Sequence, residues 1–197
     1  DDMGLDKTIQ VLARLVAERT TDQGPGPTMV VCPLSVVGNW KHETHDFAPE
    51  LDVYVHHGAE RESGDALVET IQSHDVIVTT YGVVRNDIGT IQDITFHRVV
   101  LDEAQKIKNT DAKRTQAIRA ISARHRFALT GTPVENRLSE LWSIMEFCNP
   151  GLLGSQTAFR EEFARPIERY GDEQKIGQLR RLIRPFILRR NKTDETI

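Results

Sequence analysis

Five short runs of the chain are rich in β-branched residues, and several of them are almost continuously apolar. Such runs are typical of strands that helices cover on both faces, because both sets of alternating side chains are then buried. The predicted strands are 28–32, 51–55, 75–79, 98–102 and 126–130.

Between these runs, apolar residues recur at spacings of three and four, which is typical of helices with one buried face. The predicted helices are 7–19, 35–47, 66–73, 112–121 and 139–147. Because strands and helices alternate along the chain, the pattern predicts an α/β fold in which helices flank a mostly parallel sheet.

The pattern changes after Pro150, where we predict charged helices at 155–169 and 172–184 and no buried strand. We therefore expect a sheet domain over 1–150 and a helical appendage over 151–197. From Gln174 to Thr193 the chain has no acidic residue. Its seven basic residues there fit either a solvated helix face or a local contact with a phosphate backbone. They are Lys175, Arg180, Arg181, Arg184, Arg189, Arg190 and Lys192.

Composition narrows the class of protein. The chain has 197 residues, 39% hydrophobic and 27% charged, which is typical of one folded domain. No apolar run approaches the ~20 residues that span a bilayer, and no export signal is evident, so we expect a soluble intracellular protein without a membrane partner. Its net charge of −4 does not indicate nucleic-acid binding. Cys32 and Cys148 lie far apart, which favours two buried thiols over a disulfide framework or a zinc site.

The first ten residues, DDMGLDKTIQ, stand where a phosphate-binding loop would lead into a helix. Such a loop wraps phosphates with backbone N–H groups and adds a lysine and a hydroxyl, which Lys7 and Thr8 supply. Asp1 and Asp6 occupy the positions of the consensus glycines. Taken alone, the segment fits a capped surface helix at least as well.

Two further motifs follow predicted strands. Asp102 and Glu103 come directly after an apolar run, where a carboxylate can hold Mg²⁺ beside a nucleotide and its neighbour can orient a water. Acidic residues at this position also serve as helix caps. The sequence Leu129-Thr130-Gly131-Thr132-Pro133 suits a turn that contacts a ligand or a neighbouring lobe, or a turn with no further role.

In this order and at these separations, the motifs carry a family resemblance. The chain resembles the first RecA-like lobe of the Swi/Snf-type branch of superfamily-2 helicase-like ATPases, the motors of chromatin remodellers and their bacterial relatives. The resemblance covers nearly the whole chain. Its blocks are DDMGLDKTIQ, CPLSVVGNW (32–40), TTY (79–81), LDEAQKIKN (101–109), LTGTP (129–133), NRLSELWS (136–143) and FILRRNK (186–192).

The resemblance implies a RecA-like P-loop NTPase lobe with ATP and Mg²⁺ as cofactors. The matching ATP-binding residues are Gly4, Leu5, Asp6, Lys7 and Thr8. Lys7 would contact the β and γ phosphates, while Thr8 and Asp102 would hold Mg²⁺. Glu103 would position the attacking water, and Gln105 would help to couple nucleotide state to lobe closure. The catalytic set is therefore Lys7, Asp102, Glu103 and Gln105.

The same resemblance implies an enzyme that moves along double-stranded DNA, usually without separating the strands. Residues matching segments near the DNA backbone are Ser35, Asn39, Trp40, Thr79, Thr80 and Tyr81. Those that would link hydrolysis to DNA movement are Thr130, Gly131 and Thr132. DNA contact would be independent of base sequence. Trp40 and Trp142 could instead be core residues, which we favour for Trp142. The protein would be cytoplasmic and nucleoid-associated in a bacterium, or nuclear in a eukaryote.

The sequence departs from the family pattern in three ways. Asp6 replaces a glycine that lets the backbone approach the phosphates, so we expect it to weaken or abolish ATP binding. The chain also starts inside the first motif, so the central strand that feeds it is expected to be missing. It stops before a second RecA-like lobe, which carries an arginine finger, so we expect the chain alone to be weakly active or inactive.

These departures leave a second hypothesis open, namely a pseudo-ATPase or fragment that serves as a DNA or protein interaction module. A metal hydrolase is a weaker alternative. It would rest on His42, His45 and the adjacent pair His56 and His57, whose spacings do not match a zinc motif.

Overall fold

The computed structural model describes residues 7–21, 25–131 and 137–188. Five parallel strands form one sheet in the order β2-β3-β1-β4-β5. The predicted α/β class is confirmed. The strands are β1 (Thr28–Cys32), β2 (Val53–His56), β3 (Val76–Thr80), β4 (Thr95–Asp102) and β5 (Ser122–Leu129).

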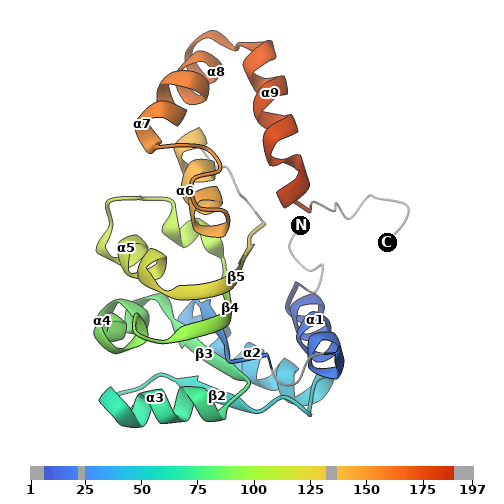
Figure 1. Ribbon diagram of the computed structural model, residues 1–197, viewed down its shortest axis with the longest axis vertical. Helices are drawn as coiled ribbons and strands as arrows, with labels where there is room; N and C mark the ends of the chain where they lie inside the picture. The colour runs from blue at the N-terminus through green and yellow to red at the C-terminus, as the bar shows by residue number, and fades with distance from the viewer. Residues whose placement is uncertain (1–6, 22–24, 132–136, 189–197) are drawn as a thin grey trace.

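Helices cover both faces of this sheet (Figure 1). They are α1 (Lys7–Thr21), α2 (Leu34–Phe47), α3 (Gly64–Ser73), α4 (Tyr81–Ile91), α5 (Lys113–Ala120) and α6 (Leu138–Cys148). Strand β1 shows why two layers of helices are needed. Its residues Val30 and Cys32 pack with α1 and α2, whereas Met29 and Val31 face the core built with α3 to α6. Each face of the sheet therefore has its own apolar core.

The pattern of the chain did not predict helix α4. Its sequence contains Gly82 and Gly89, and each glycine destabilises a helix by about 1 kcal/mol relative to alanine. Tertiary packing compensates, because Val84 and Ile91 are completely buried in the core. The Thr80 hydroxyl also accepts a hydrogen bond from the Val83 N–H at 3.3 Å and so caps the first turn.

The C-terminal helices form a third apolar core beyond one end of the sheet (Figure 1). They are α7 (Gln156–Phe159), a single π-helical turn (Arg160–Ala164), α8 (Arg165–Tyr170) and α9 (Glu173–Ile183). Helix α6 belongs to two cores, because Phe147 packs against the sheet and Met145 packs against the appendage. Trp142 is also buried there, and its indole N–H donates to the Gly154 carbonyl at 3.1 Å, which confirms its core assignment.

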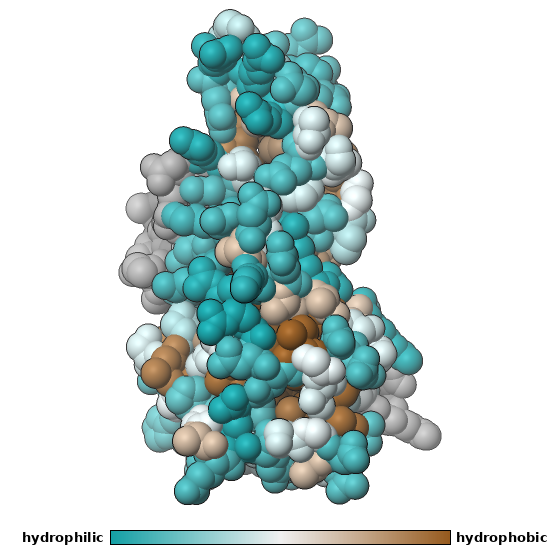
Figure 2. Space-filling model, turned by 90° about the vertical axis from the view of Figure 1, so that its left-hand side faces the viewer, coloured by the Kyte–Doolittle hydropathy of each residue, from teal (hydrophilic) through white to brown (hydrophobic). Residues whose placement is uncertain are grey.

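One face of the molecule is mainly polar (Figure 2), and both cysteines are free thiols. The face in Figure 2 is mainly hydrophilic, with apolar atoms in separate small patches. In the described part of the chain, no helix is both long and apolar enough to cross a bilayer. Cys32 is a free thiol, as predicted, and its burial raises its pKa to about 12. Cys148 is also free but only partly buried.

Candidate functional site

The candidate site lies at the carboxyl edge of the sheet, where the ends of parallel strands meet. Asp102 is the last residue of β4, and Thr130 follows the paired end of β5. Tyr81 follows β3, and Lys7 begins helix α1. The fold thus gathers at one edge residues that stand far apart in the sequence.

The carboxylate of Asp102 is held by two hydrogen bonds. The Trp40 indole N–H donates to Oδ2 at 2.9 Å, and the Glu103 backbone N–H donates to Oδ1 at 2.9 Å. Burial raises the pKa of Asp102 above its ordinary value, and these two hydrogen bonds and the positive charge of Lys7 offset only part of that rise.

Hydrogen bonds through Gln105 connect Glu103 to Thr130, the residue that follows β5. The Gln105 side-chain amide donates to Glu103 Oε2 at 2.5 Å, and the Thr130 hydroxyl donates to Gln105 Oε1 at 2.9 Å. Glu103 also has a left-handed backbone, with φ of 52° and ψ of 54°. This conformation is uncommon for residues other than glycine, and such strain concentrates at functional sites. The structure brings together the predicted water-positioning residue and two predicted coupling residues.

The residues present fit a magnesium ion. Among the described residues, each Asp102 oxygen accepts one hydrogen bond, which leaves it a second lone pair for another partner. The Thr8 hydroxyl lies in the first turn of α1, where N–H groups favour an anion. Oxygen donors with a single carboxylate are typical of Mg²⁺ sites that nucleotide phosphates complete. Gly4, Leu5, Asp6 and Thr132 lie outside the described residues.

The six residues assigned to DNA contact divide into two groups. Ser35 and Asn39 are exposed on α2, and their role stays a prediction. The other four residues are buried in the described part of the chain, and their role in DNA contact also stays a prediction; they are Trp40, Thr79, Thr80 and Tyr81. Two of these four stabilise the sheet edge by donating hydrogen bonds, Thr79 to the His56 carbonyl at 2.9 Å and Tyr81 to the Asp102 carbonyl at 2.8 Å.

A cavity of about 550 Å³ lies beside this edge. Its walls come from α1, the outer side of β5, α6 and the segment 186–188. Among the described strands, β5 pairs only with β4, so its outer edge faces this cavity. Lys7 and Thr130 both line it, which connects it to the candidate site. No pattern in the sequence predicted this cavity.

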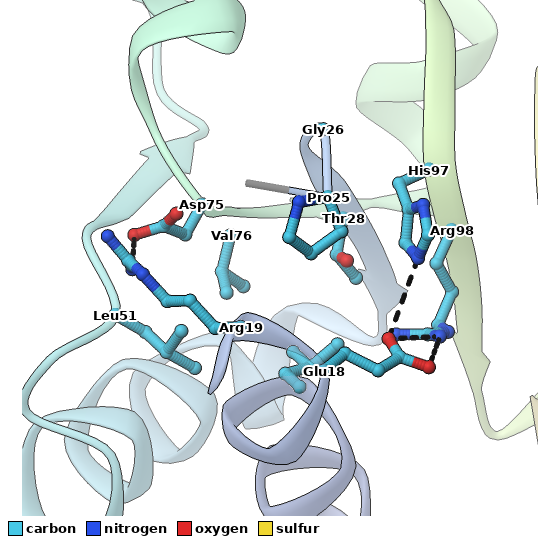
Figure 3. Close-up of a pocket in the computed structure, with 11 residues that line it drawn as sticks. Glu18, Arg19, Pro25, Gly26, Thr28, Leu51, Asp75, Val76, His97 and Arg98 are labelled. Atoms are coloured by element: carbon cyan, nitrogen blue, oxygen red, sulfur yellow. Dashed lines mark hydrogen bonds and ion pairs between the residues drawn. The ribbon is translucent and has the colours of Figure 1, made fainter. Parts of the chain in front are cut away.

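At its opposite end, α1 is fixed to the amino ends of the strands (Figure 3). Arg98 of β4 is 1% exposed, and its Nη2 contacts both carboxylate oxygens of Glu18, at 2.8 and 2.6 Å. Arg19 pairs with Asp75 just before β3. These contacts fix the position of α1 along the sheet and therefore the position of Lys7 relative to Asp102.

No candidate zinc site emerges from the described part of the chain, where no three His, Cys, Asp or Glu side chains are placed to share a metal ion.

The His56 ring nitrogen Nε2 lies 2.8 Å from Asp87 Oδ2, and Arg61 contacts the same carboxylate through two nitrogens. Sequence reasoning also missed this network, in which only the His56 side chain is fully buried.

Comparison with known proteins agrees with this geometry. Residues 1–196 match the model of the SNF2-related domain. The chain is 46% identical over its full length to YwqA of Bacillus subtilis, named as an ATP-dependent helicase/translocase, and spans 21% of that protein. It is 36% identical to the TATA-binding protein-associated factor MOT1 of Saccharomyces cerevisiae, across 98% of this chain and 12% of MOT1.

A solved structure shows the same fold. The SWI2/SNF2 ATPase core of Sulfolobus solfataricus in complex with dsDNA superposes with a TM-score of 0.89 at 42% identity. The match covers all of this chain and 40% of the Sulfolobus chain. The expected RecA-like lobe is therefore confirmed, and the chain belongs to the SNF2-related domain family.

Proposed function

We propose that this chain is the ATP-binding lobe of a DNA-dependent ATPase that moves along double-stranded DNA. One observation carries the proposal: Lys7, Asp102, Glu103 and the Gln105–Thr130 hydrogen bond lie at one edge of the sheet. The named functions of the relatives support it. The chain spans 21% of YwqA, 12% of MOT1 and 40% of the Sulfolobus chain, so movement along DNA is proposed for the whole protein rather than for this lobe alone.

The chemistry follows from the positions of the chain's own groups. Lys7 neutralises charge on the terminal phosphates, and the N–H groups at the start of α1 bind their oxygens. Thr8 and Asp102 would hold Mg²⁺, which would supply positive charge beside the phosphates. Glu103 orients the attacking water. Gln105 donates to the Glu103 carboxylate and accepts from the Thr130 hydroxyl. A movement of the Glu103 carboxylate therefore passes through Gln105 to the segment after β5.

This function predicts that the chain distinguishes nucleotides by their phosphates. We expect MgATP and MgADP to bind at least tenfold more tightly than AMP, because a hydrogen bond to a charged group contributes about 1.5–3 kcal/mol and AMP lacks both terminal phosphates. Chelating Mg²⁺ with EDTA should remove most of the difference. Calorimetric titration measures both effects, and equal affinity for AMP and ATP would contradict a phosphate site at Lys7.

The DNA partner is part of the same proposal. The exposed Ser35 and Asn39 on α2 can reach phosphate oxygens, which carry no base information. We expect binding of duplex DNA to be independent of base sequence and to weaken steeply as salt rises, because contact with phosphates releases counterions. Fluorescence anisotropy from 50 to 200 mM salt checks this expectation. A salt-insensitive, base-specific footprint would exclude it.

A second candidate function is a non-catalytic interaction module, which Asp6 favours because an acidic residue there replaces a glycine of the phosphate-binding motif. Such a module would retain the fold and the DNA contacts without binding ATP. The nucleotide titration separates the two functions, since a module of this kind would bind neither ATP nor ADP.

A further inference from the structure

Helix α2 has two faces that meet different partners. Ser35 and Asn39, four residues apart, are exposed on its outer side. Trp40 lies on the inner side with 1% of its surface exposed, and its ring packs in the core between α1, α2 and the sheet. Its indole N–H, at the edge of the ring, donates to the Asp102 carboxylate.

The hydrogen bond from Trp40 is costly to lose. A buried N–H without an acceptor loses its hydration with no compensation, and Asp102 Oδ2 is the acceptor that the structure provides at 2.9 Å. The bond is also assisted by charge, because the acceptor is a carboxylate. The indole N–H occupies one lone pair of Oδ2, so only the other lone pair of that oxygen can bind a metal ion.

A second hydrogen bond reaches the same residue from another element. Tyr81, the first residue of α4, is 5% exposed, and its hydroxyl donates to the Asp102 carbonyl at 2.8 Å. The backbone and the carboxylate of Asp102 are thus held from the β3–α4 junction and from α2, respectively. Sixty-two residues separate Trp40 from Asp102, so only the folded chain forms this pair.

We propose that Trp40 is a positioning residue, whose indole N–H orients the Asp102 carboxylate toward the metal and joins the exposed face of α2 to the metal ligand. The inference rests on the proposed nucleotide site and deepens it. Trp40 acts through Asp102, because only 1% of its surface is exposed and its indole N–H donates to that carboxylate.

Trp40→Phe tests the proposal, because phenylalanine keeps an aromatic ring and removes the N–H. We expect the Mg²⁺ concentration for half-maximal binding of a fluorescent ATP analogue to rise about tenfold, with little change in binding without Mg²⁺. Trp142→Phe is the matched control, since it also removes a buried indole N–H. The Trp142 N–H donates to the Gly154 carbonyl in the appendage rather than to Asp102. An unchanged Mg²⁺ requirement in Trp40→Phe, or an equal rise in Trp142→Phe, would overturn the proposal.

A second measurement uses the unsubstituted chain and needs no nucleotide. The chain has two tryptophans, so its ¹⁵N spectrum contains two indole N–H signals. We expect Mn²⁺, a paramagnetic substitute for Mg²⁺, to broaden the Trp40 signal before the Trp142 signal, and Asp102→Asn to abolish this difference. Equal broadening of both signals would overturn the inference.

The two readouts separate this inference from the proposed function. Selective broadening without ATP binding would contradict the nucleotide site and leave the link between Trp40 and the metal ligand intact. Normal MgATP binding with an unchanged Mg²⁺ requirement in Trp40→Phe would leave the proposed function intact and overturn the inference.

Discussion

Replacing Glu18 by glutamine is expected to lower the free energy of unfolding by about 3–5 kcal/mol, because it leaves the buried Arg98 guanidinium without its counter-charge. Arg98 has little else to compensate its burial. Its guanidinium lies 4.7 Å from the centre of the Phe127 ring, and its Nε and Nη1 atoms have no hydrogen-bond partner among the described residues. Urea unfolding followed by circular dichroism measures the loss.

Two further variants make this test specific. The double variant Glu18→Gln/Arg98→Met removes both charges and should be more stable than Glu18→Gln alone, because no uncompensated charge remains. Arg14→Gln is the control. Arg14 also pairs with Glu18, but its side chain is 63% exposed, so its loss should change stability by less than about 1 kcal/mol. A similar loss of stability in Glu18→Gln and Arg14→Gln would show that the buried Glu18–Arg98 pair does not stabilise the fold more than the exposed pair does.

The same cluster makes stability depend on pH. Burial tends to raise the pKa of Glu18, but hydrogen bonds and charges from Arg98 and Arg14 outweigh it and lower that pKa. Burial, with Arg98 nearby, also lowers the pKa of His97. Both lowered values mean that the folded chain binds protons less readily than the unfolded chain, so stability falls as pH falls. The loss should begin with His97 near its unfolded pKa of about 6.5 and continue with Glu18 below about pH 4.3.

Replacing Asp6 by glycine is expected to tighten MgATP binding by tenfold to a thousandfold. A carboxylate about 4 Å from a phosphate charge costs on the order of 4 kcal/mol at an effective dielectric constant near 20, and bound Mg²⁺ relieves part of that cost. Glycine also lets the backbone approach the phosphates more closely. Because Asp6 lies outside the described residues, this expectation rests on its place in the sequence motif.

Calorimetric titration of the two chains gives the ratio of their dissociation constants. Asp93→Gly is the matched control, since Asp93 is an exposed acid just before β4 at the amino edge of the sheet, away from Lys7. Its affinity for MgATP should equal that of the unsubstituted chain. Equal affinities of the unsubstituted and Asp6→Gly chains would show that Asp6 does not oppose phosphate binding.

The order of strands and helices could be predicted because buried parallel strands and amphipathic helices leave strong periodic signals. Strand β5 shows where that signal fails. It begins at Ser122 rather than 126, because three of its first four residues are polar and exposed while their backbone pairs with β4 from Thr95 onward. Edge strands do not need apolar residues on both faces, so hydrophobicity alone places their ends poorly.

The candidate site was predictable only where chemistry follows directly after a strand. Asp102 and Thr130 could be placed at the same edge of the sheet because strand ends in parallel sheets converge, and the structure joins Gln105 to Thr130. The partners of Trp40 and Arg98 could not be predicted. Both pairs join residues more than sixty positions apart, and a tryptophan in an amphipathic pattern is indistinguishable from an ordinary core residue.

The central claim is that the start of α1 beside Asp102 binds the phosphates of MgATP. Its most direct test is titration of a fluorescent MgATP analogue into Asp6→Gly and into the same chain with Lys7→Ala, with the exposed Lys113→Ala as control. We predict saturable binding by Asp6→Gly that Lys7→Ala weakens at least tenfold and Lys113→Ala leaves unchanged. Binding that is unaffected by Lys7→Ala, or no binding by the Asp6→Gly chain, would contradict the claim.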